Sequence, residues 1–178
     1  MFIKLDEKVY NDLHRKQEII EMSETSVLSK KRIKCKEIMS EKVTSVPPDT
    51  TLRDVAKLLK TKDIGILPVV DSEGRLTGLV TDRDIVVRAV AEGADVLATP
   101  VGEIMTTETF TAGPDDFAFE AARTMGEKKV RRVPIVDEAG VLVGIVSIAD
   151  IALEMEDEIE IAETLEEISS GKGFWNKR

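Results

Sequence analysis

The stretch that decides the fold is Gly78-Leu79-Val80-Thr81-Asp82-Arg83-Asp84, which the apolar run Ile85-Val86-Val87 follows. This pattern predicts a strand that ends at a hydroxyl residue and leads directly into a helix. The backbone N–H groups and the dipole at such a helix start favour phosphate. The carboxylate of Asp84, three residues beyond Thr81, is the kind of group that accepts hydrogen bonds from two ribose hydroxyls. The stretch is therefore a candidate ligand site.

A second stretch, Gly144-Ile145-Val146-Ser147-Ile148-Ala149-Asp150, repeats this pattern 66 residues later and also continues into an isoleucine. At that offset residues 36–85 align with residues 102–151 without a gap, and 16 of the 50 aligned positions are identical. Self-similarity at a fixed spacing is the mark of a structural repeat. The chain therefore contains a duplicated unit.

Both copies predict the same order of elements. A short extended segment (43–46 or 109–112) precedes an amphipathic helix. The apolar face of that helix contains Leu52, Val55, Ala56 and Leu59 in the first copy, and Phe117, Ala121, Ala122 and Met125 in the second. Two apolar strands follow, at 66–70 and 76–80 in the first copy and at 133–136 and 141–146 in the second. An Asp-x-x-Gly sequence between the strands is typical of a type I turn, and a second helix begins after the hydroxyl residue. Each unit is thus β-α-β-β-α.

A unit of about 50 residues has a small core, so the two copies are expected to pack together around a shared interior. The predicted fold is α+β, with two pseudo-symmetric repeats and helical flanks. We place an N-terminal helix and linker at 1–32, the first repeat at 33–98, the second repeat at 99–152 and an acidic helix extension with a tail at 153–178. The apolar stripe from Ile151 to Leu165 could pack on the chain's own core or on another subunit.

Composition narrows the classes of function. The net charge of −9 argues against broad binding of nucleic acid, because phosphate contacts need clustered Lys and Arg. The basic segment 30–36 keeps DNA or RNA as a weaker alternative. The single cysteine excludes an internal disulfide and fits a reducing compartment. With no apolar run near the roughly 20 residues of a membrane span and no secretory signal, we expect a cytoplasmic protein.

Catalysis is not expected from this chain. It has one histidine, His14, one cysteine, Cys35, and no paired carboxylates placed for acid–base work. It also has no Gly-rich phosphate loop of the P-loop or dinucleotide type. His14 has no second His or Cys near it, so no metal site is expected, and no cofactor is required.

Four motifs occur in both copies and carry a resemblance to a known family. They are Glu-Ile-Met (37–39 and 103–105), Pro-Asp (48–49 and 114–115), a Pro-Val-Val-Asp or Pro-Ile-Val-Asp strand end, and Gly-hydrophobic-Val-Thr/Ser-x-x-Asp. Together they resemble tandem CBS (cystathionine-β-synthase) domains, a pair called a Bateman module, over about residues 33–152. The chain is similar in particular to small stand-alone bacterial or archaeal proteins made of one such pair.

The resemblance implies a disc-like homodimer that binds an adenine nucleotide (AMP, ADP or ATP) or a related adenosyl compound in clefts between the repeats. It also implies roles for individual residues. Thr81 and Ser147 would contact phosphate, and Asp84 and Asp150 would hold the ribose hydroxyls. The basic residues expected near the phosphates are Arg83, Arg131 and Arg132, and the apolar residues expected to stack on adenine are Val43, Ile66, Val130 and Val133. The basic residues differ between the copies, so the two clefts should differ in phosphate preference.

Simpler interpretations stand beside these roles. Thr81-x-x-Asp84 and Ser147-x-x-Asp150 are also helix capping boxes, and capping is compatible with ligand binding. Adjacent strand residues point to opposite faces, so only one of Arg131 and Arg132 is expected to enter a cleft. Two functions are consistent with the pattern: a ligand-sensing regulatory protein that signals to a protein partner, or a constitutive structural or assembly subunit with empty clefts that acts through its terminal helices.

Overall fold

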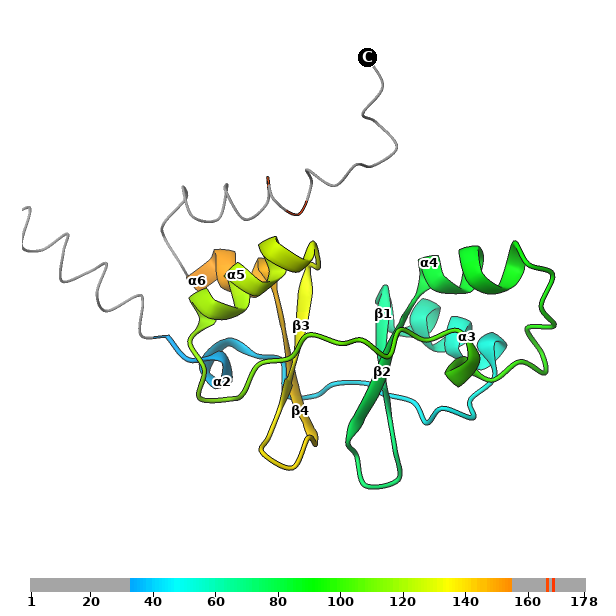
Figure 1. Cartoon of the computed structure of the whole chain (residues 1–178), viewed down its shortest axis with the longest axis horizontal. Coiled ribbons are helices and arrows are strands. Elements are labelled where there is room, and N and C mark those ends of the chain that lie inside the picture. The colour runs from blue at the N-terminus through cyan, green and yellow to red at the C-terminus, as the bar shows by residue number, and fades with distance from the viewer. Residues whose placement is uncertain (1–32, 155–165, 167, 169–178) are drawn as a thin grey trace, which may run out of the picture.

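Two β-hairpins lie side by side in the computed structural model, and the helices of each gather at the end opposite its turn (Figure 1). The structure describes residues 33–154, 166 and 168. The first repeat contains α3 (Leu52–Lys62), β1 (Ile66–Val70), β2 (Leu76–Thr81), α4 (Asp82–Asp84) and the wider helical turn η1 (Ile85–Val90). The second contains α5 (Ala118–Lys128), β3 (Arg132–Val136), β4 (Leu142–Ser147) and α6 (Ile148–Glu154). The predicted α+β fold of two like units is confirmed.

The two hairpins have the same register. Ile66 pairs with Thr81 in the first hairpin, and Arg132 pairs with Ser147 in the second. Each antiparallel ladder also has its irregularity at the same place, after Val69 and after Ile135. A one-residue slip would turn every side chain to the other face, so the shared register keeps equivalent residues inside. Residues 66 positions apart in the sequence therefore occupy equivalent positions in the two hairpins.

The extended segments predicted at 43–46 and 109–112 are shorter than expected. Each forms a single parallel bridge, Val46 with Val69 and Ala112 with Ile135. Val46 donates its N–H to the carbonyl of Pro68 (3.0 Å) and accepts the N–H of Val70 (2.9 Å). Because Pro68 has no N–H to donate, only its carbonyl takes part in this bridge.

The first helix of each unit buries its predicted face with one exception. Thr51 caps α3 by accepting the N–H of Asp54 (3.3 Å), and the core side of α3 consists of Leu52, Val55 and Leu59. Ala56 is exposed beside a surface groove, so its predicted place on the core face is wrong. At 3.6 residues per turn it lies about 70° around the helix from the middle of the buried stripe. In α5 the predicted residues Ala121, Ala122 and Met125 are buried, and Phe117 is the half-buried residue before the helix.

The short helices α2 (Cys35–Ile38) and η2 (Val101–Glu103) do not pack on the repeat to which the sequence alignment assigns them. Cys35 is fully buried in the core of the second repeat, and its N–H donates to the carbonyl of Asp116 (2.8 Å). Val101 and Ile104 belong to the core of the first repeat, and the N–H of Val101 donates to the carbonyl of Thr50 (2.8 Å). The shared interior expected from the sequence is wrong, because each repeat has a hydrophobic core of its own. Each core is completed by a segment that the alignment gives to the other copy.

Ion pairs hold the start of α2 on the second repeat. The amino groups of Lys34 and Lys36 lie 2.7 and 2.8 Å from the Oδ1 of Asp115. Their hydrogen bonds and charges lower the pKa of the Asp115 carboxyl to about 2. The carboxylate therefore stays charged across the physiological pH range, and both ion pairs persist over that range.

Two glycines make the exchange of segments sterically possible. A Cβ added to Gly144 would collide with the side chain of Met39, and one on Gly78 would lie 2.7 Å from the Sδ of Met105. Glycine is found in strands where another part of the chain approaches closely. The methionine of each Glu-Ile-Met motif thus crosses the glycine of the other repeat's strand.

The turns of the two hairpins also meet. The N–H of Leu76 donates to the carbonyl of Gly140, and the N–H of Leu142 donates to the carbonyl of Gly74, both at 3.0 Å. Gly74 and Gly140 both have φ of +79°, a conformation that glycine adopts without steric cost. The predicted Asp-x-x-Gly turns therefore link the repeats as well as closing each hairpin.

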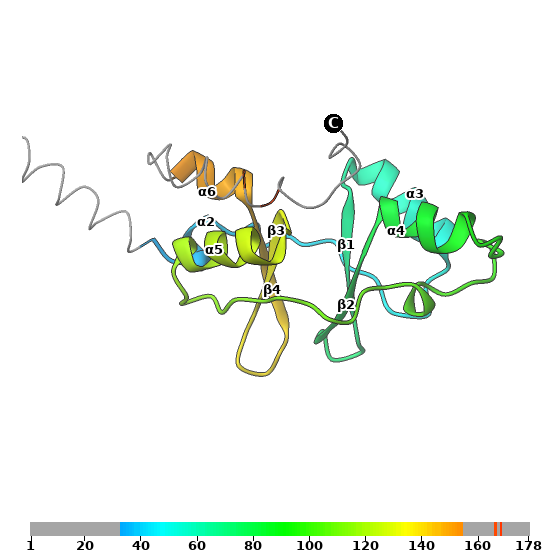
Figure 2. The same ribbon diagram turned by 45° about the horizontal axis from the view of Figure 1, so that its top comes forward.

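The predicted N-terminal helix and linker (1–32) and most of the C-terminal extension (153–178) lie outside the described residues. At the start of the predicted C-terminal stripe, Ile151 is buried in the core of the second repeat, and Ile168 packs against the same cluster. Among the helices that the structure describes, none is long and apolar enough to cross a membrane. Figure 2 shows that each repeat keeps its own pair of helices, α3 with α4 and α5 with α6.

Candidate ligand-binding clefts

Both repeated motifs form the capping box that the sequence allows. Thr81 donates its N–H (2.9 Å) and its hydroxyl (2.7 Å) to the Oδ2 of Asp84, whose N–H donates to the Thr81 hydroxyl oxygen (3.1 Å). Ser147 donates the same two bonds to the Oδ2 of Asp150 at 2.7 and 2.6 Å, and receives the N–H of Asp150 at 3.2 Å. Each box uses only Oδ2 of the carboxylate, so Oδ1 is left for another partner.

A cavity of about 460 Å³ lies beside the second motif. Its walls come from both repeats. One side is formed by the segment before α3, the end of α3 and strand β1, and the other side by β3, β4 and α6. The first repeat and the segment before it supply Ser40, Lys42, Val43, Thr44, Lys62, Ile64, Ile66 and Pro68, and the second supplies Arg132, Ile145, Ser147 and Asp150. The predicted cleft between the repeats therefore exists at the second motif.

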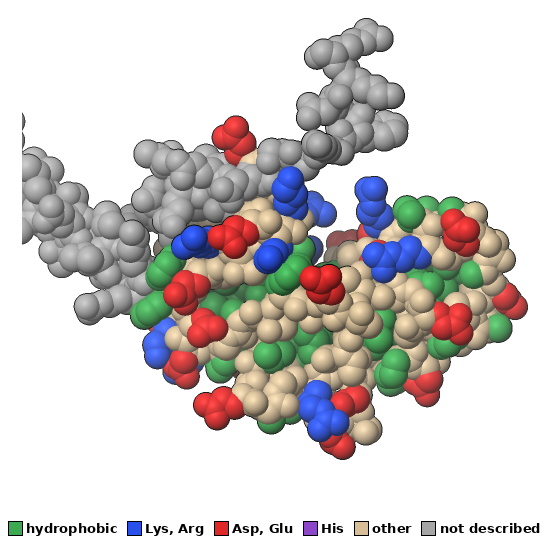
Figure 3. All heavy atoms as spheres, in the orientation of Figure 1, with side chains coloured by type: hydrophobic (Ala, Val, Ile, Leu, Met, Phe, Trp, Pro, Cys, Tyr) green, Lys and Arg blue, Asp and Glu red, His purple; other side chains and the backbone are tan. Residues whose placement is uncertain are grey.

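The lining of this cavity is basic. It has three cationic side chains, Lys42, Lys62 and Arg132, and one carboxylate, Asp150. Figure 3 shows Lys and Arg side chains gathered on both sides of the hollow between the two repeats. A concave site lined by one sign of charge raises the local concentration of the opposite charge, so this cavity favours an anionic ligand.

The first motif has a different environment. The Nε of Arg88 lies 3.3 Å from the Oδ1 of Asp84. The Nη1 of Arg88 donates to the carbonyl of Ile104 (2.8 Å) and to the hydroxyl of Thr106 (3.0 Å). The sequence interpretation did not single out Arg88. Its spacing of four residues from Asp84 on a helix was the one signal that could have found it.

Five of the residues predicted to bind ligand line the cavity: Val43, Ile66, Arg132, Ser147 and Asp150. Of the adjacent arginines only Arg132 does so, whereas Arg131 is exposed and lies outside it. Arg83 is also exposed, and its backbone N–H donates to Asp82 (2.7 Å). Val130 packs against the second core, and Val133 is fully buried in that core, so neither side chain lines this cavity.

Several lining residues were not predicted. Lys42 and Thr44 flank Val43, and Ser40 follows the Glu-Ile-Met motif, so their positions in the sequence were a usable signal. Lys62 is identical to Lys128 in the alignment of the two copies. Their shared place in a cleft appears only when the two repeats are packed together.

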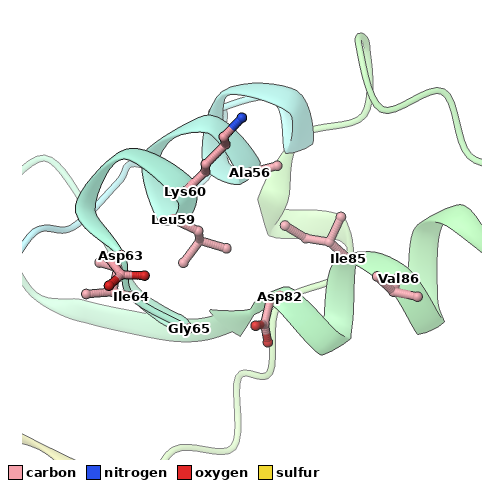
Figure 4. Close-up of a pocket in the computed structure, with 9 residues that line it drawn as sticks. All are labelled: Ala56, Leu59, Lys60, Asp63, Ile64, Gly65, Asp82, Ile85 and Val86. Carbon is pink, nitrogen blue, oxygen red and sulfur yellow. The ribbon is translucent and has the colours of Figure 1, made fainter.

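A second cavity, of about 490 Å³, lies between α3 and the α4–η1 segment (Figure 4). Leu59 and Ile85 point into it from the two helical segments, and Asp63 and Asp82 lie at its rim. Ile64 lines this cavity and also the one beside Asp150. Ile64, two residues before β1, therefore contributes to the walls of both cavities.

Comparison with known proteins places the chain in a family. The CBS domain matches it twice, at residues 35–90 and 101–157, and the chain belongs to the CBS-domain family. A curated relative, the CBS domain-containing protein YhcV of Bacillus subtilis, is 38% identical over 134 residues. The match covers 75% of this chain and 94% of the relative. The chain is thus similar over most of its length to a small protein built from CBS domains.

Solved structures of CBS-domain pairs have the same fold. Hypoxic Response Protein I with two coordinated zinc ions has a TM-score of 0.64 at 37% identity, and the match covers 68% of this chain and 98% of that one. The CBS domain pair of MJ0100 in complex with 5′-methylthioadenosine and S-adenosyl-L-methionine has a TM-score of 0.60 at 32% identity, covering 67% and 93%. CBSX2 in complex with AMP has a TM-score of 0.61 at 27% identity, covering 68% and 94%.

Two of these three structures hold adenosyl compounds, and the other holds zinc. Within residues 33–154, 166 and 168 of the present chain, no group of three His, Cys, Asp or Glu side chains is placed to hold a metal ion.

Proposed function

We propose that this protein is a regulatory, non-catalytic sensor that binds an adenine nucleotide or a related adenosyl compound beside Asp150. The observation that carries the proposal is the cavity in which Ser147 and Asp150 of the second repeat face Val43 and Ile66 from the first. The adenosyl compounds in the MJ0100 and CBSX2 structures support this class of ligand.

The lining suggests how the ligand lies. The Oδ1 of Asp150 would accept the ribose hydroxyls, and the adenine would lie against Val43 and Ile66. Three cations and one carboxylate give the lining a net charge of +2, which favours phosphate-bearing ligands such as AMP, ADP or ATP over the cationic S-adenosylmethionine.

Thermal unfolding with AMP, ADP, ATP, NAD and S-adenosylmethionine tests the proposal. A ligand at 100 times its dissociation constant adds about 2.7 kcal/mol to the free energy of unfolding, which raises Tm. The variant Asp150→Ala should lose the shift relative to its own ligand-free Tm, because the ribose hydroxyls lose their acceptor. The variant Asp49→Ala, at an exposed position outside the cavity, should keep it. If no adenosyl compound shifts the wild type, the sensor proposal fails.

We also propose that the protein acts as a cytoplasmic homodimer whose arrangement is read by a protein partner. On η1 the large side chains Val86 and Val90 are 58% and 57% exposed, beside an apolar groove along α3, and a second copy of this surface would cover them. A ligand can shift a dimer between two arrangements only by its difference in affinity for them. Sedimentation velocity tests this step, since a monomer at all concentrations would contradict it.

The second candidate function is a constitutive assembly subunit, which the sequence predicts to act through its terminal helices, and the same exposed valines offer it a further apolar surface. In that case the apolar surface of η1 and α3 binds a partner whether or not the clefts are filled. The thermal unfolding series separates the two functions, because an assembly subunit shows no Tm shift with any of the five compounds.

A further inference from the structure

The two motifs differ in what contacts the second oxygen of the carboxylate. At the first motif, the Oδ1 of Asp84 is paired with Arg88. At the second, the Oδ1 of Asp150 has neither a hydrogen bond nor an ion pair to any of the residues that the structure describes, and Asp150 lines the cavity. The position equivalent to Arg88, 66 residues later, is Glu154, so the sign of the charge is reversed.

The guanidinium of Arg88 lies where the second cleft has open space. Ser40 and Asp150 line the open cavity. Their equivalents at the 66-residue offset are Thr106 and Asp84, and Arg88 contacts both of them. The side chain of Asp84 is 16% exposed and that of Arg88 is 46% exposed, so the carboxylate is largely covered while the arginine stays open to solvent on one side.

A third contact anchors the guanidinium. Its Nη1 donates to the carbonyl of Ile104, a residue of the first core. A ligand that needed the Oδ1 of Asp84 would have to break contacts with Asp84, Ile104 and Thr106 together. Hydrogen bonds with a charged partner are roughly twice as strong as neutral ones, which favours the closed arrangement.

Side chains at the opposite wall of the first cleft also contact one another. The amino group of Lys128 lies 4.9 Å from the centre of the Phe110 ring, in a cation–π contact. Phe110 and Lys128 are the equivalents of Thr44 and Lys62, which both line the open cavity. One face of the Phe110 ring, on which an adenine could stack, therefore already has a cation of the chain itself over it.

We propose that Arg88 is an internal occupant of the first cleft, so that each chain binds one adenosyl ligand, beside Asp150, rather than two. This inference rests on the proposed function and adds that the first motif is closed to the same ligand. It makes Asp84 a helix cap and a partner of Arg88, whereas Asp150 is a helix cap and a ligand contact.

Equilibrium dialysis of the full chain with radiolabelled AMP tests the inference. The wild type should bind one AMP per chain, Asp150→Ala should bind none, and Asp84→Ala should still bind one. Arg88→Met, which keeps the aliphatic stem, should bind two, and the second AMP should be lost when Asp84→Ala is added. The control Arg123→Met breaks the exposed pair between Arg123 and Glu127, which has the same spacing of four residues, and should still bind one.

Two results would overturn the inference while leaving the proposed function in place. They are two AMP per wild-type chain, and an Arg88→Met variant that binds one AMP or none. Loss of the single AMP in Asp84→Ala, with binding kept in Asp150→Ala, would place the ligand at the first motif and contradict both. The comparison of wild type, Asp84→Ala and Asp150→Ala decides the question even where Arg88→Met does not fold. If AMP does not bind, the same variants are dialysed with whichever of the other four compounds raises the wild-type Tm. A wild type that binds none of the five compounds contradicts the proposed function and the inference together.

Discussion

At the scale of single residues, burial determines the chemistry of Cys35. The side chain is fully buried on the second repeat, and burial together with the charges of Asp116 and Glu120 raises the pKa of its thiol to about 11. At pH 8 the reactive thiolate is then only about one part in a thousand. We expect DTNB to leave the folded protein unmodified at pH 8, and to titrate one thiol after unfolding in guanidinium chloride. Rapid reaction of the folded protein would contradict the packing of α2 on the second repeat.

Residues 81–84 show how far local pattern predicts a site. The capping box was predictable because it depends on a spacing of three residues within one helix start. The role of Arg88 was not, because its contacts with Ile104 and Thr106 join positions 16 and 18 residues apart in the chain. The same limit applies to Val133. The alternation of side chains along a strand shows that Val133 and its neighbours face opposite sides, but not which side meets the core and which meets a cleft.

At the scale of elements, the crossing of Met39 over β4 is a sterically tight contact. A methyl group on Gly144 would overlap the side chain of Met39, and overpacking of this kind costs roughly 1–3 kcal/mol. We expect Gly144→Ala to lower the free energy of unfolding in urea by about that amount. The matched change Gly65→Ala should be close to neutral, because its methyl would meet Asp82 at an ordinary 3.6 Å.

The double variant Gly144→Ala with Met39→Ala identifies the cause. Substitutions at residues in contact are not additive, so the pair should cost less than the sum of the two single changes. Additive costs, or a Gly144→Ala variant as stable as Gly65→Ala, would show that Met39 can move aside without penalty.

At the scale of the whole molecule, the duplication predicts the equivalence of the repeats but not the assignment of their ends. Gly78 and Gly144 could be aligned from the sequence, and the hairpins that contain them have the same register. The alignment could not show that α2 completes the second core and η2 the first, because both segments carry the same Glu-Ile-Met motif. Similar segments that exchange places leave no trace in a comparison of one copy with the other.

Two fragments of similar length test where the first repeat ends. Residues 44–107 contain the whole first core, including Val101 and Ile104, whereas residues 33–98 lack both and instead carry Cys35 without its partners. Units of this size are near the lower limit for independent folding, so the loss of two core residues should be decisive. We expect far-ultraviolet circular dichroism to show a cooperative thermal transition for 44–107 and none for 33–98. If 33–98 melts as cooperatively as 44–107, the contacts of η2 contribute little, and the boundary at residue 98 drawn from the sequence is the better one.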